Sequence, residues 1–224
     1  MGRMDKGKSG WGGKRDGAGR PKSSPMVSHL KRPRVGKNRP IQITLKIRKD
    51  APDLRDPQIL DVFEKATLRA RRFGLRIIHF AFMPHSIELV CEFKKQEELE
   101  KSFKSLNTSL AIALKKFFEL KTGKKHNGPI FLGRFHMNVL STPDEVRLAT
   151  RDLYLKSAFL AKNDAAPDHY SSAAIFNSWK ELLREEWTEA FENPQFENGH
   201  VQKLKHITAI PQFWLTQTGW RESV

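Results

Sequence analysis

A chain of 224 residues suits one folded domain of about 100–150 residues with additional segments. Its single cysteine, Cys91, excludes an intrachain disulfide framework and a cysteine-based zinc cluster, and no apolar run approaches the roughly 18 residues of a membrane-spanning helix. The net charge of +15 favours a polyanionic partner, of which nucleic acid is the commonest, and we expect no membrane partner.

The charge is distributed unevenly along the chain. Residues 1–40 contain 12 Lys or Arg and 2 Asp, residues 41–160 carry a net charge of +8, and residues 161–224 one of −3. The first 38 residues contain few large apolar side chains, so they cannot bury enough surface to offset the entropy of ordering. We predict a disordered basic arm over 1–38, a folded domain over 39–162 and a C-terminal helical tail over 163–224 that packs on the core.

The folded domain begins with a strand and a helix. Apolar and polar residues alternate from Ile41 to Ile47, which predicts a half-buried strand. A helix follows, capped by Asp53 or Asp56 and running to about Phe73, with Gly74 as its stop.

Two further strands are predicted from Arg76 to Phe82 and from Ser86 to Phe93, joined by a turn at Met83 to His85. Because successive side chains of a strand point to opposite faces, the second of these strands has two different faces. One face carries Ser86, Glu88 and Val90, and the other carries Ile87, Leu89 and Cys91.

A long helix is predicted from about Glu97 to Lys121, a fourth strand from Arg134 to Leu140, and a helix from Pro143 to about Ala161, capped by Thr142. The order β-α-β-β-α-β-α predicts an α+β, ferredoxin-like (split βαβ) fold, with a four-stranded antiparallel sheet and covering helices. In the tail we expect a helix from Ser171 to Trp187, a loop from Asn193 to Gly199, and packing of Trp214 and Trp220 against the core.

Several segments together resemble a known family. The stretch Met83 to Glu92 is similar to the Met-Pro-Asn-His-x-His-Leu-x-x-Glu strand of single-tyrosine HUH transposases, in particular the REP-associated tyrosine transposases. Further similarity to this family covers nearly the whole chain in order, at Gly12 to Lys22, Arg39 to Ile47, Gly128 to His136, Thr142 to Val146, Asp168 to Ala173 and Trp214 to Arg221.

The resemblance implies an HUH-transposase-like fold whose three chemical positions are altered. In the family two histidines hold a divalent ion at the scissile phosphate, and a helix tyrosine attacks it. These positions fall on Ser86, Glu88 and Asp152. A serine hydroxyl is a poor metal ligand, and a lone carboxylate such as Glu88 seldom makes a site. Tyr154 lies roughly 200° around the helix from position 152, so it cannot simply replace the nucleophile.

The resemblance therefore predicts a cytoplasmic, nucleoid-associated protein that binds single-stranded or hairpin DNA without cleaving it, without a cofactor, as a monomer or homodimer. One alternative is an active nuclease that uses Mg²⁺ or Mn²⁺ between Glu88 and Asp152, which would face each other, assisted by His79 or His136. The other alternative is an RNA-binding module, although the sheet lacks a clear pair of exposed aromatic residues.

We consider the roles of three histidines that are not at the family's metal-binding positions. For His79 and His136, stabilisation of the sheet and contact with phosphate both stay open. We expect His85 to be a turn or core residue, because strand parity directs it away from the face that carries Glu88.

Candidate contacts with nucleic acid fall into two groups. The segment Gly19 to Lys22 is similar to the core of an AT-hook, in which an Arg-Pro arm enters the minor groove. The basic arm supplies Arg15, Arg20, Lys22, Arg32 and Arg34. The domain supplies Lys121, Lys124, Lys125, Arg134 and His136, around a Gly-rich loop, with Lys46, Arg48 and Lys49 as weaker candidates.

Overall fold

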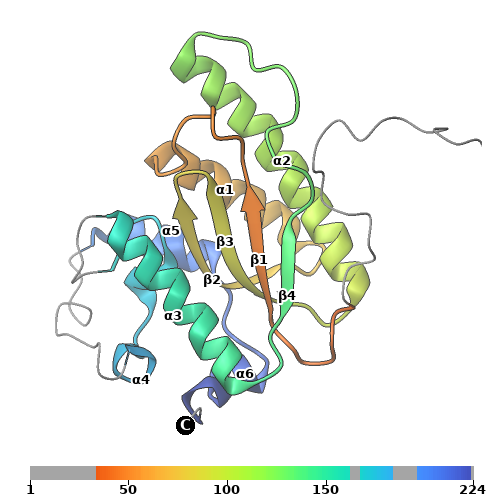
Figure 1. Ribbon diagram of the computed structural model, residues 1–224, viewed down its shortest axis with the longest axis vertical. Coiled ribbons are helices and arrows are strands. Elements are labelled where there is room, and N and C mark those ends of the chain that lie inside the picture. Colours follow the sequence, from red (N-terminus) through yellow and green to blue (C-terminus); the bar gives the residue numbers. More distant parts are fainter. Residues whose placement is uncertain (1–33, 162–166, 184–195, 223–224) are drawn as a thin grey trace, which may run out of the picture.

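The protein is described by a computed structural model over residues 34–161, 167–183 and 196–222. Four strands form one antiparallel sheet in the order β2-β3-β1-β4 (Figure 1). They are β1 (Ile41–Lys46), β2 (Arg76–Met83), β3 (Ser86–Glu92) and β4 (His136–Val139). This order is that of the split βαβ arrangement, so the predicted fold class is confirmed. Most of the predicted basic arm lies outside the described residues.

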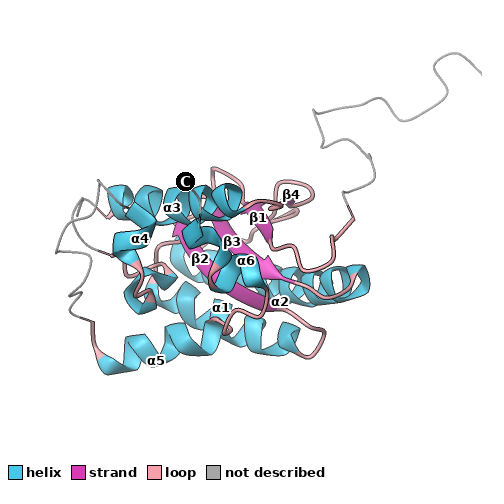
Figure 2. Ribbon diagram, turned by 90° about the horizontal axis from the view of Figure 1, so that it is seen from below, coloured by secondary structure: helices cyan, strands magenta, loops and turns pink. Residues whose placement is uncertain are grey.

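The inner face of the sheet is covered by two helices, α1 (Pro57–Arg71) and α2 (Gln96–Thr122). Figure 2 shows them on the opposite side of the sheet from α3. Asp56, not Asp53, caps α1 by accepting a hydrogen bond from Gln58 N at 2.9 Å. Alternate residues of the strands, including Ile43, Leu89 and Cys91, are fully buried here and form the larger hydrophobic core with both helices.

The outer face is only partly covered. Helix α3 (Pro143–Leu160) begins with a capping box between Thr142 and Glu145 and packs against β2 and β3. Val90, Leu153 and several residues of the tail form a second buried cluster beneath it. In Figure 1, α3 crosses in front of the sheet on the side of β2, whereas β1 and β4 lie beside it.

The tail contains η1 (Ser172–Ile175), α4 (Trp179–Leu183), α5 (Asn198–Ile207), α6 (Trp214–Gln217) and η4 (Gly219–Glu222). It lies along β2, where Phe82 N donates to Tyr170 O at 2.8 Å and Ala209 N donates to Ile77 O at 2.7 Å. Leu204 and Ile207 of α5 are buried in the larger core.

Three predictions for the tail differ from the structure. The helix predicted from Ser171 is wrong over its first part, because Phe176 is extended and separates η1 from α4. The predicted loop 193–199 contains the start of α5 at Asn198. Trp220 is buried as expected, but Trp214 is 52% exposed.

The fourth strand is shorter than predicted. Leu132 N donates to Lys46 O at 2.8 Å and Phe131 bridges Ile47, but regular pairing with β1 begins only at His136. Residues 134 and 135 therefore belong to a loop, although the strand was predicted to begin at Arg134.

Candidate nucleic-acid interface

The outer side of β1 and β4 carries a polar surface. Thr44 lies opposite Glu88 on one neighbouring strand and opposite His136 on the other, so these three side chains share one row and one face. In the next row Gln42 lies opposite Asn138. His136 and Asn138 are exposed, so this surface offers hydrogen-bond donors and acceptors to a ligand.

Basic side chains gather at the end of the sheet where β1 stops and β4 starts. Lys46 and Arg134 are exposed there, and the loop that carries Arg134 is joined to Lys46 by the bond to Leu132. Lys124 and Lys125 line a neighbouring hollow of about 410 Å³, together with Arg48. We call Lys46, Lys124, Lys125 and Arg134 the basic loop cluster.

Two other candidate cations are already engaged within the protein. Lys121 Nζ lies 3.1 Å from Asp56 Oδ2, and Arg48 donates two hydrogen bonds to Asp50. The guanidinium of Arg48 lowers the pKa of Asp50 through these bonds. Both cations are thus partly neutralised and are weaker candidates for phosphate than the basic loop cluster.

The remaining predicted cations belong to the arm. Arg34 is exposed at the start of the described chain. Arg15, Arg20, Lys22 and Arg32 lie outside the described residues.

The positions that correspond to the family's metal ligands and nucleophile do not come together as a metal site. Ser86 and Glu88 point to the outer face, as expected from strand parity. Asp152 lies on the solvent side of α3, where it pairs with Arg151 at 3.7 Å and with Lys156 at 4.0 Å. The expectation that Glu88 and Asp152 face each other is therefore wrong, because the buried side of the helix is occupied by Leu153 and its neighbours.

The described residues also do not supply enough ligands for a metal ion. Within the described ranges, no three His, Cys, Asp or Glu side chains gather closely enough to hold a metal ion. A hard divalent cation needs several oxygen or nitrogen donors at once. The donor set therefore does not fit the Mg²⁺ or Mn²⁺ of the nuclease alternative.

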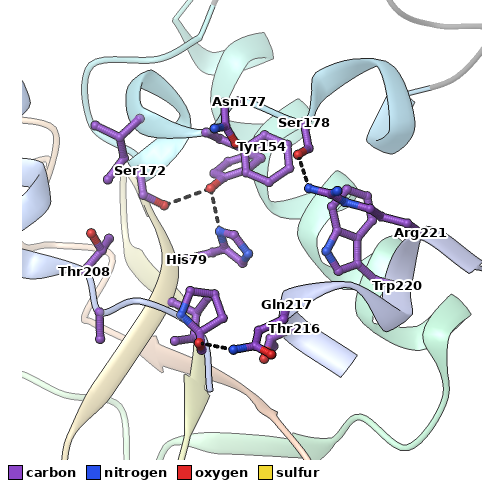
Figure 3. A pocket seen from close by; sticks show the side chains of 15 residues that line it. His79, Tyr154, Ser172, Asn177, Ser178, Thr208, Thr216, Gln217, Trp220 and Arg221 are labelled. Carbon is purple, nitrogen blue, oxygen red and sulfur yellow. Dashed lines mark hydrogen bonds between the residues drawn. The ribbon is translucent and has the colours of Figure 1, made fainter. Parts of the chain in front are cut away.

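Tyr154 is buried in the second cluster, facing a hollow of about 200 Å³ bordered by Trp220 and Arg221 (Figure 3). Its hydroxyl lies 2.8 Å from His79 Nδ1 and 3.0 Å from Ser172 Oγ. Burial raises the pKa of Tyr154, so the nucleophilic phenolate is disfavoured. The prediction that Tyr154 does not take the place of a nucleophile at position 152 agrees with this geometry.

The histidines divide by position. Of the two roles left open for His79, the structure supports stabilisation of the sheet, because its ring is held between Tyr154 and Phe176. His136 is exposed on the outer face. His85 lies in the turn between β2 and β3, where its carbonyl accepts a hydrogen bond from Ile47 N at 2.9 Å.

Two buried carboxylates were missed as organising residues. Glu92 is fully buried and accepts hydrogen bonds from the backbone N–H groups of Gln212 and Phe213 at 2.9–3.0 Å. Asp168 accepts two hydrogen bonds from Arg55, at 2.7 and 2.8 Å. Both positions lie in segments that resemble the family, but their partners are distant in sequence and carry no local signal.

One solved structure resembles this chain in fold. It is a REP-associated tyrosine transposase bound to a REP hairpin, with a TM-score of 0.50 and 12% sequence identity, covering 76% of this chain and 94% of that one. The likeness shows that the chain has a transposase-like fold. No protein-family model matches the sequence, and no curated protein matches it.

Two further solved structures are less similar in fold. A Deinococcus radiodurans protein assigned as a transposase has a TM-score of 0.39 and 15% identity, covering 60% of this chain and 98% of that one. A bacterial tRNA-His guanylyltransferase-like protein in complex with ATP has a TM-score of 0.37 and 10% identity, covering 69% of this chain and 73% of that one. Among the described helices, none is both long and apolar enough to cross a membrane.

Proposed function

We propose that this protein binds DNA, in hairpin or single-stranded form, through the outer side of β1 and β4 and the basic loop cluster, and that it does not cut the DNA. The observation that carries the proposal is the uncovered polar row of Thr44 and His136 beside the exposed Lys46 and Arg134. Phosphate groups would contact the cations, and these contacts supply most of the affinity of such complexes. The resemblance to a transposase bound to a hairpin supports the choice of DNA over RNA.

The placement of Asp152 and Tyr154 supports the proposed absence of cleavage. In-line attack needs a nucleophile held close to the phosphorus, and that positioning is worth up to about 7–11 kcal/mol. Asp152 is turned to solvent, and Tyr154 is buried with its hydroxyl bonded to His79 and Ser172. Neither residue is placed to form a covalent bond to DNA held on the sheet.

Binding is tested with a hairpin oligonucleotide and a variant of the basic loop cluster. Replacing Lys124, Lys125 and Arg134 by alanine removes three phosphate contacts, and we expect the slope of log K against log[salt] to flatten by about 2 to 3. The control replaces Lys65, Arg69 and Arg72 on or just after α1, in the layer on the inner side of the sheet. Equal losses for both triple variants would contradict the proposed surface.

Cleavage is tested by trapping a phosphotyrosyl adduct of the wild type with the same hairpin in the presence of Mn²⁺. We expect no adduct. A covalent adduct would contradict the proposal. A rise in melting temperature with Mn²⁺ that disappears in Glu88→Ala would instead support the nuclease alternative.

A further inference from the structure

A second basic surface lies at the opposite end of the sheet, where β1 begins and β4 ends. A groove of about 690 Å³ opens there, between the segment before β1, the connection from β3 to α2, the start of α3 and the turn into α6. Its lining includes three cations, Lys37, Arg39 and Lys94, and none of the described residues that line it is acidic. We call this the Trp214 groove, after the aromatic residue that it also contains.

The indole of Trp214 is exposed but held in place. Its side chain is 52% exposed although it lies in an ordered helical turn. One part of the ring packs directly on Gly219, where an added Cβ would come within 2.7 Å of the ring. An exposed and fixed aromatic ring beside cations is the arrangement on which bases of single-stranded nucleic acid stack.

A buried carboxylate fixes the segment that carries this ring. Glu92, at the end of β3, accepts hydrogen bonds from Gln212 N and Phe213 N, and the hydroxyl of Thr216 also donates to it. These bonds hold the turn that precedes Trp214 and the first turn of α6 against the sheet. The ring is therefore positioned before any ligand arrives, which lowers the entropic cost of binding.

The cations are also positioned around the groove. Arg39 donates to Ser141 Oγ at 3.1 Å, and its side chain lies across Gly36. A guanidinium has five N–H donors, so this bond leaves others for a phosphate. Lys37 lies in the turn before β1, and Lys94 lies just after the end of β3.

We propose that the Trp214 groove holds an unpaired nucleotide of single-stranded DNA, with its base stacked on Trp214 and its phosphate near Lys37, Arg39 and Lys94. This inference rests on the proposed DNA-binding function and adds a second surface that contacts the DNA. β4 separates this groove from the basic loop cluster and spans roughly 13 Å at 3.3 Å per residue. One strand of DNA that follows β4 would meet both surfaces.

The test compares a short oligothymidylate with a blunt hairpin, by fluorescence anisotropy, for the wild type, Trp214→Ala and Trp214→Phe. Loss of one base stack is worth about 1–3 kcal/mol, or roughly 5- to 150-fold in affinity. We expect Trp214→Ala to lose this much for oligothymidylate and less than about twofold for the hairpin, while Trp214→Phe retains most of the affinity. Phe159→Ala is the matched control, because Phe159 is 74% exposed on α3 outside the groove.

The outcomes separate this inference from the proposed function. If the wild type binds neither oligonucleotide, the proposed DNA-binding function and the proposed nucleotide site are both wrong. If the wild type binds both oligonucleotides and Trp214→Ala binds oligothymidylate as tightly as the wild type does, the Trp214 groove is not a nucleotide site. The proposed DNA-binding function is then unaffected. The proposed nucleotide site is also contradicted if Trp214→Ala loses the same affinity for both oligonucleotides, or if Phe159→Ala loses as much affinity as Trp214→Ala. Tighter binding of oligouridylate than of oligothymidylate by the wild type overturns the choice of DNA.

Discussion

Burial determines the protonation of His79 and Tyr154, which are hydrogen-bonded to each other. His79 Nδ1 and the Tyr154 hydroxyl are 2.8 Å apart, beside the rings of Phe176 and Trp179. Burial lowers the pKa of His79 to about 4, so the imidazole is neutral at neutral pH. The pair thus acts as an uncharged part of the second cluster.

This pKa predicts a pH dependence of stability. The unfolded chain binds a proton at His79 near pH 6.5 and the folded chain only near pH 4, so the unfolded state gains protons first as the pH falls. We expect the free energy of unfolding to decrease by about 2–3 kcal/mol between these values from this residue. Urea denaturation of the wild type and His79→Gln at several pH values measures it, and parallel pH profiles would contradict the assignment.

Asp168 and Arg55 form a buried ion pair, with 2.7 Å between Arg55 Nη2 and Asp168 Oδ1. Asp168 is 2% exposed and also accepts a hydrogen bond from Ser157. Replacing Asp168 by alanine leaves the guanidinium of Arg55 buried without its partner, and we expect a loss of about 3–5 kcal/mol in unfolding free energy. Asp50→Ala is the control, because it breaks an Arg–Asp pair of similar geometry that is exposed. We expect the melting temperature of this control to stay nearly unchanged.

At the scale of elements, the turn from α1 into β2 depends on Gly74. Its φ is +93°, and an added Cβ would lie 2.9 Å from Glu98 Cγ on α2. Gly123, which ends α2, has a φ of +66° with no atom within 4 Å of an added Cβ. We expect Gly123→Ala to cost about 1 kcal/mol and Gly74→Ala more, because it adds a clash to the backbone strain. Thermal denaturation of both variants measures the difference, and equal shifts would show that the contact with Glu98 adjusts freely.

The elements of the domain could be predicted because their patterns are local. The alternation in β3 correctly separated Leu89 and Cys91, which lie in the larger core, from Val90, which lies in the second cluster on the other face. The tail was harder, because its helices are short and their boundaries are set by distant contacts. The hydroxyl of Ser172, for example, bonds to the backbone of Phe80 on β2, and the helical turn η1 that Ser172 begins already ends at Ile175.

The candidate sites also differ in how far the sequence predicts them. Lys124, Lys125 and Arg134 could be predicted as exposed cations of one loop. The Trp214 groove could not, because it is assembled from four segments that are far apart in sequence. Trp214 was assigned to packing because apolar side chains are usually buried, and its exposure depends on the turn that Glu92 holds.

At the scale of the whole molecule, the net charge of +10 over residues 1–40 predicts a strong salt dependence of binding. Val35 N donates to Gln96 Oε1 at 3.0 Å, so the natural point for truncation lies before residue 34. If the arm engages about five phosphates, deleting residues 1–33 flattens the slope of log K against log[salt] by about four. Anisotropy titrations at several salt concentrations measure this, and an unchanged slope would mean that the arm takes no part in binding.

The path of the tail along β2 has a consequence for solubility. Strand β2 is the outermost strand on its side, and its backbone groups at Phe82, Phe80 and Ile77 bond to Tyr170, Ser172 and Ala209. Without these partners β2 would present an unpaired apolar edge, which is a template for pairing with another copy. A chain that ends after α3 would therefore aggregate, so the tail protects the sheet in addition to carrying Trp214.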